Sequence, residues 1–62
     1  MAGKLDSRIK TIAELKMMEM DITEYLREVL DEVKPSRLNM EIARLGLTDL
    51  LSEDVEQVVH GL

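Results

Sequence analysis

The chain has 62 residues, with 13 acidic and 8 basic side chains, a net charge of −5 and no cysteine. A domain of this length buries only about 60% of the surface that its unfolded chain exposes, so residues 1–62 form one domain that needs added stabilisation. The absence of cysteine excludes disulfides and thiolate zinc sites, and the negative charge disfavours broad binding to nucleic-acid phosphates or anionic lipid. Association with a partner chain is the source of stability that remains.

Apolar residues make up 45% of the chain, too many for a disordered acidic tail, and Tyr25 is the only aromatic residue. A core of Leu, Ile, Val and Met is typical of a helical bundle, and no segment alternates as a strand would, so we expect an all-α fold. The sequence shows neither a signal-peptide pattern nor 18 consecutive apolar residues. We therefore expect a cytoplasmic protein that does not enter the membrane.

The first predicted helix covers residues 5–33 and ends before Pro35, which disfavours helical backbone at Lys34. One face of this helix carries Leu15, Met18, Ile22, Tyr25, Leu26, Val29 and Val33. A face rotated from it by roughly 100° carries Leu5, Ile9, Ile12 and Met20. The apolar face therefore changes sides near the middle of the segment.

Two structures account for this change of face. Either one long helix presents its halves to different neighbours, or the chain bends near Asp21, where Glu24 completes a capping box and Met20 packs on Tyr25. No Gly or Pro accompanies the bend, and an equally good box occurs at residues 11–14, so we favour the continuous helix and a bundle of three helices rather than four. A helix of thirty residues is about 45 Å long, whereas a compact domain of this size spans less than about 30 Å. Its N-terminal half would need a second chain to cover it.

The second predicted helix covers residues 37–45. Ser36 is its expected N-cap, and Gly46 is expected to close it in the left-handed conformation. Leu38, Ile42 and Leu45 lie on one side of the helix, and Met40, Ala43 and Leu47 lie on another. The resulting apolar arc of about 200° is typical of a helix between two layers.

The third predicted helix covers residues 49–60, after a cap at Thr48 or Ser52. Its apolar face carries Leu51, Val55, Val58, Val59 and Leu62, and its opposite face is acidic. Glu53, Glu56 and His60 have the spacing of an oxygen and nitrogen metal site, but nothing else could complete it, and a solvated helix face is the preferred interpretation. No pattern indicates catalytic residues, so we expect no enzyme activity, no metal and no cofactor.

Residues 37–59 also have the spacing of a helix-turn-helix around Gly46, which keeps a small DNA-binding transcriptional regulator as the alternative function. Two features oppose it. Ser52 stands where an apolar residue normally packs, and the helix that would enter the major groove is acidic. Nucleic acid is therefore an unfavoured partner.

Methionine fills gaps in cores, but it also lines adaptable binding surfaces, and Met17 and Met20 lie off the main apolar face. We predict a small non-enzymatic protein-protein interaction module, acting as an adaptor, inhibitor or regulator. Its predicted interaction surface consists of Leu5, Ile9, Ile12, Met17, Met20, Met40 and Leu47. The expected partner is a second copy of the chain in a homodimer, because twofold pairing lets one patch cover itself, and a different protein is the other option.

Overall fold

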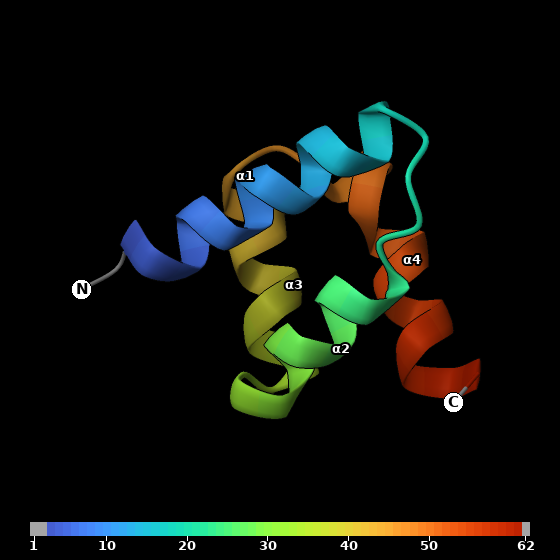
Figure 1. Cartoon of the computed structure of the whole chain (residues 1–62). Helices are drawn as coiled ribbons and strands as arrows, with labels where there is room; N and C mark the ends of the chain where they lie inside the picture. Colours follow the sequence, from blue (N-terminus) through green and yellow to red (C-terminus); the bar gives the residue numbers. More distant parts are fainter. Residues whose placement is uncertain (1–2, 62) are drawn as a thin grey trace.

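The computed structural model describes residues 3–61 as four helices, with no strand in that range. The helices are α1 (Gly3–Met17), α2 (Thr23–Glu32), α3 (Pro35–Arg44) and α4 (Thr48–Gly61). In Figure 1, α1 lies across the top of the other helices, and α4 packs against α3 and α2. The expected all-α fold is confirmed, with four helices. No helix between residues 3 and 61 has the length and apolar character needed to cross a membrane.

The continuous helix over residues 5–33 is wrong. Helix α1 ends at Met17 and α2 begins at Thr23, so the chain breaks where the alternative placed a bend near Asp21. The break needs neither Gly nor Pro because Glu19 takes the left-handed conformation, with φ of 63°, that usually belongs to glycine at a helix end. The change of apolar face along the segment therefore marks two helices.

Residues around Pro35 and Gly46 set the bounds of α3. Pro35 occupies the first turn, where its missing N–H costs no hydrogen bond, and the extended Lys34 before it is the N-cap. The prediction that Ser36 is the N-cap is wrong, since Ser36 lies inside the helix. Gly46 closes α3 as predicted, with φ of 75°. Its N–H donates to the Ala43 carbonyl at 3.0 Å.

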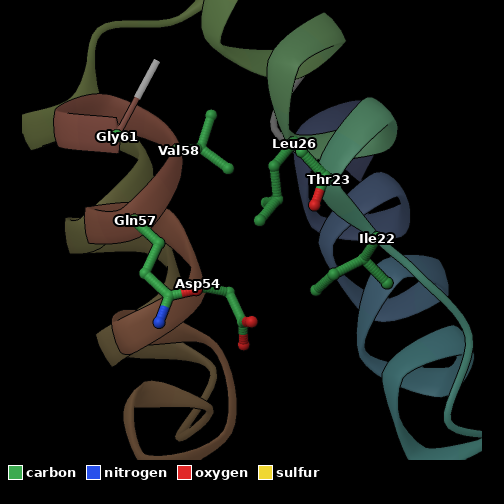
Figure 2. Close-up of a pocket in the computed structure, with 7 residues that line it drawn as sticks. All are labelled: Ile22, Thr23, Leu26, Asp54, Gln57, Val58 and Gly61. Carbon is green, nitrogen blue, oxygen red and sulfur yellow. The ribbon is translucent and has the colours of Figure 1, made fainter.

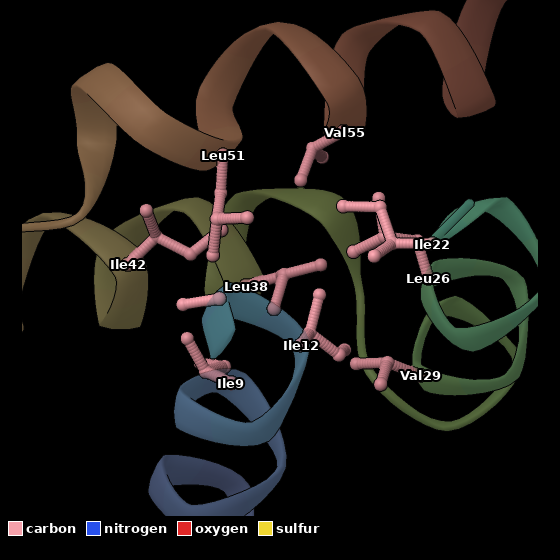
Figure 3. Packing of buried hydrophobic residues seen from close by; sticks show 10 residues of the cluster. Ile9, Ile12, Ile22, Leu26, Val29, Leu38, Ile42, Leu51 and Val55 are labelled. Atoms are coloured by element: carbon pink, nitrogen blue, oxygen red, sulfur yellow. The ribbon is translucent and has the colours of Figure 1, made fainter. Parts of the chain in front are cut away.

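All four helices contribute to one apolar core, shown in Figure 3. The buried residues are Ile9, Ile12, Ala13, Ile22, Leu26, Val29, Leu38, Ile42, Leu51 and Val55. Among the residues placed by the structure, no polar or charged side chain is buried. The break after α1 makes this core possible, because it lets α1 fold back over the other helices.

Ile9 and Ile12 occupy the middle of this core. Their side chains are only 1% and 4% exposed, and Figure 3 shows them pointing toward Leu38 and Val29. The expectation that a second chain covers them is therefore wrong, because the chain's own helices already do so. The molecule measures 29 × 24 × 18 Å, within the span expected of one compact domain.

Met18 and Tyr25 also depart from the predicted pattern. Both were expected on the buried face of the long helix, and both are exposed. Met18 keeps its helical position, since its N–H donates to the Glu14 carbonyl at 3.1 Å. It is exposed because α1 buries the face of Ile9 and Ile12, which lies roughly opposite to Met18 at about 100° per residue. Tyr25 lies in the first turn of α2. One periodicity drawn across the break is right for α2, where Leu26 and Val29 are buried, and wrong for α1, which buries a different face.

Candidate protein-binding surface

Three exposed methionines lie at the end of α1 and in the connection that follows it. The side chains of Met17, Met18 and Met20 are 71%, 67% and 48% exposed. We call these three residues the methionine loop; the connection curves outward at the upper right of Figure 1. Single exposed apolar residues are ordinary, whereas three within four positions concentrate apolar side chains in one short segment of the surface.

The backbone of the methionine loop is held by hydrogen bonds. The N–H of Met20 donates to the Leu15 carbonyl at 3.0 Å, and the N–H of Glu19 donates to the Lys16 carbonyl at 2.8 Å. This pair of bonds is the Schellman motif, which satisfies carbonyls that the helix end would otherwise leave unpaired. The loop is therefore a fixed turn, and its methionines project from a defined backbone.

Glu19 is the strained residue of this turn. A left-handed conformation costs a residue with a Cβ atom roughly 1–2 kcal/mol, and glycine avoids that cost. Gly46 occupies the equivalent position at the end of α3, where the Leu47 N–H donates to the Ile42 carbonyl at 2.9 Å. The same motif is thus built twice in the chain, once with glycine and once with a strained glutamate.

The far side of the loop is anchored at the start of α2. The Asp21 carboxylate accepts a hydrogen bond from the Thr23 N–H at 3.0 Å, and Ile22 between them is buried in the core. The Thr23 N–H favours the charged carboxylate, and with the Thr23 hydroxyl it lowers the pKa of Asp21 below its ordinary value. Asp21 therefore fixes the entry to α2 from the position before the N-cap, which is Ile22 and not Asp21 as the capping box predicted.

A second contact fixes the end of α1. Lys16, the residue before Met17, forms an ion pair with Asp54 of α4, and both side chains are partly buried. Lys16 lies in the last turn of α1, where a positive charge also interacts favourably with the helix dipole. The methionine loop is thus positioned on one side by an ion pair and on the other by the buried Ile22.

The structure separates the residues that were predicted to form one interaction surface. Met17 and Met20 are exposed as predicted, and Met40 is exposed on a different helix, α3. Leu5 and Leu47 are partly buried against the core. Leu5 also precedes Met17 by twelve residues along α1, which is about 18 Å along the helix axis.

Two residues of the predicted interaction surface, Ile9 and Ile12, are buried in the core and are not part of any surface. One residue was missed. Met18 joins the loop because α1 ends before it, and the signal that could have found it is the capping pattern at Asp21. If the capping pattern is taken to start a new helix, it predicts that Met18 lies between two helices.

A cavity of about 260 Å³ lies beside the loop, between the start of α2 and the end of α4. Figure 2 shows Leu26 and Val58 facing each other across it, with Asp54 and Gln57 on the α4 side. Its polar groups are a carboxylate already paired with Lys16, an amide and the Thr23 hydroxyl. This lining contains no histidine or cysteine and supplies no nucleophile beside a base.

No group of three His, Cys, Asp or Glu side chains that could hold a metal ion occurs in the described part of the chain. The chain matches no family model, no curated protein and no solved structure. What the protein does must therefore be inferred from its own surface, whose most unusual feature is the methionine loop.

Proposed function

We propose that the protein is a small non-enzymatic binding module that contacts another protein chain through the methionine loop. The observation that supports this is the exposure of Met17, Met18 and Met20 on a turn held in place by hydrogen bonds. Methionine side chains are flexible and polarizable, so a cluster of them can adapt to an apolar partner surface. A turn fixed in advance loses little conformational entropy on binding.

A stable interface buries about 800 Å² on each partner, which is more than three side chains provide. The methionine loop would therefore be the apolar anchor of a larger contact, with neighbouring polar residues at its rim. A second copy of the chain is the first partner to test. A twofold axis through the loop would pair the same methionines from both copies.

Met18→Glu tests this proposal, with Met40→Glu as its control. Both side chains are 67% exposed, so the two substitutions add the same charge at equally accessible positions. If the loop mediates self-association, sedimentation equilibrium will show a concentration-dependent dimer for the wild type and for Met40→Glu. Met18→Glu will remain a monomer with unchanged helicity by circular dichroism.

A wild type that stays monomeric at high concentration would rule out the homodimer. Binding to a different protein is then tested in cells with a photo-crosslinking residue in place of Met18. The same residue in place of Met40 is the control. Crosslinked protein partners that appear equally at both positions would contradict a role for the loop.

One feature of the structure supports the alternative function, a DNA-binding regulator. The α3 and α4 helices are joined by the Gly46 turn as in a helix-turn-helix. However, α4 presents exposed Asp49, Glu53 and Glu56, which would repel DNA phosphates. We expect no binding to duplex DNA in a mobility-shift assay at low salt, and retention of DNA that weakens as salt is raised would favour the regulator instead.

A further inference from the structure

Half of the basic side chains gather around one groove, although the chain is acidic overall. The groove has a volume of about 490 Å³ and lies between the start of α1 and the α2–α3 connection. Four of the 8 basic residues line it: Lys4, Arg8, Lys34 and Arg37. In Figure 1 the start of α1 lies at the left and the α2–α3 connection at the bottom, and both are distant from the α1–α2 connection at the upper right. A protein of net charge −5 thus presents a local concentration of positive charge.

Most of this positive charge is unmatched. Glu32 is the acidic residue of the lining, and it pairs with Arg8 at 3.2 Å. Within residues 3–61, Lys4, Lys34 and Arg37 form no ion pair. Three exposed cations that share a groove repel each other, and an anionic ligand would relieve that repulsion.

The groove also has apolar walls. Leu5 of α1 and Val33, at the end of α2, are partly buried there and pack against the core. The first turn of α3 borders the same space, where Ser36 lies beside backbone N–H groups that have no partner within the helix. The groove therefore combines apolar contacts with positive charge.

We propose that this groove binds an acidic peptide segment of another protein, with an apolar side chain between its carboxylates. The carboxylates would meet Lys4, Lys34 and Arg37, and the apolar side chain would contact Leu5 and Val33. This site lies apart from the methionine loop and does not depend on the function proposed for that loop.

A peptide fits these walls better than a nucleic acid does. A phosphodiester backbone has no apolar side chain to place against Leu5 and Val33. The lining contains no aromatic ring on which a base could stack. The net charge of −5 would also repel a phosphate chain that extends beyond the groove.

Fluorescence anisotropy tests the proposal with a labelled peptide of sequence Glu-Asp-Leu-Glu-Asp. Two comparison peptides carry Gly in place of Leu, or Lys in place of every acidic residue. We expect the acidic Leu peptide to bind more tightly than both, and its affinity to fall as salt is raised.

Lys34→Glu combined with Arg37→Glu should weaken this binding by about tenfold or more, because two attractive charges become repulsive. The control is Lys10→Glu combined with Arg27→Glu, two exposed cations outside the groove. Both double variants have a net charge of −9, since each reversal changes the charge of −5 by −2. Glu near the N-terminus of α3 is favourable to the helix, so the groove variant should remain folded, which circular dichroism checks.

Four results would overturn the proposal. One is that the peptide fails to bind, and another is that both double variants weaken binding equally. A third is that the Gly peptide binds as tightly as the Leu peptide. The last is that a labelled oligothymidylate binds more tightly than the peptide and depends on Lys34 and Arg37, which would assign the groove to single-stranded nucleic acid.

Discussion

At the scale of single residues, Glu19 has a strained backbone conformation. Among residues 3–61 it is the only one other than glycine with positive φ. The surrounding hydrogen bonds compensate for the strain, and strained residues of this kind persist where the surrounding structure determines their conformation. The left-handed conformation of Glu19 forms the turn that carries the methionine loop.

Glu19→Gly should therefore stabilise the protein. Glycine removes the steric cost of the left-handed conformation but adds entropy to the unfolded chain, and the net gain should be about 0.5–1 kcal/mol. Urea unfolding followed by circular dichroism measures this change. Glu19→Gln is the control for charge and should be neutral, whereas Gly46→Ala should destabilise because it places a Cβ at the equivalent position. A destabilised Glu19→Gly protein would show that the glutamate side chain contributes more than its backbone costs.

Asp21 makes a pH-dependent contribution to stability. Its pKa in the folded chain is below the ordinary value of 3.8, chiefly because the Thr23 N–H donates to its carboxylate. A lowered folded pKa means that the stabilisation is fully present above the unfolded pKa and is lost as the pH falls through the folded pKa. The wild type should therefore exceed Asp21→Ala in urea midpoint at neutral pH, and the difference should shrink below about pH 4. A difference that stays constant down to pH 2 would show that the charge of Asp21 is irrelevant.

At the scale of elements, α1 is joined by an ion pair to each of the other helices. Arg8 pairs with Glu32 of α2, Asp6 pairs with Arg44 of α3 at 3.0 Å, and Lys16 pairs with Asp54 of α4. Exposed pairs contribute little to stability, typically about 0–1 kcal/mol each. Burial of Ile9, Ile12 and Ala13 therefore holds α1 in place, and the ion pairs help to orient it.

The start of α3 offers a second test of local structure. Lys34 has the extended backbone of an N-cap, but it provides no side-chain acceptor for the N–H groups of the first turn. Lys34→Ser should supply that acceptor and stabilise the protein by about 0.5–1 kcal/mol. Ser36→Ala should change stability by less than about 0.5 kcal/mol, since Ser36 lies inside the helix. If Ser36→Ala costs as much as a lost cap in urea unfolding, α3 begins two residues later than described, at Arg37.

At the scale of the whole molecule, one core formed by four short helices removes the need for a partner to bury α1. The exposed methionines are thus free to serve binding, because the fold does not use them. Stability and the proposed interaction therefore depend on different residues of the N-terminal segment. Ile9 and Ile12 face inward, and Met17 at the helix end faces outward.

This separation predicts opposite effects for two substitutions. Ile9→Ala should cost about 2–5 kcal/mol, because it leaves a cavity among residues that cannot readily close it. Met18→Ala should cost less than about 0.5 kcal/mol, as expected at an exposed site. Thermal unfolding compares the two directly. If Met18→Ala destabilises the protein more than Ile9→Ala does, the data would favour the long continuous helix, with Met18 in the core and Ile9 at an interface.

The sequence by itself determined the features that depend on neighbouring residues. Apolar spacing of helical period indicated an all-α fold, Pro35 marked the end of the helix before it, and Gly46 marked the end of α3. These residues act through their own backbone preferences, since proline lacks an N–H and glycine tolerates positive φ, so their effects can be predicted without the fold.

Only the tertiary structure decided where the long N-terminal segment breaks and which of its faces is buried. Glu19 has no local preference for the left-handed conformation, and the capping pattern at Asp21 competed with an equally good one earlier in the chain. Burying Ile9 and Ile12 against α2 and α3 requires α1 to fold back, and that burial outweighs the strain at Glu19. The basic groove is likewise a product of the fold, because Lys4 approaches Lys34 and Arg37 only after the break brings α1 beside the α2–α3 connection.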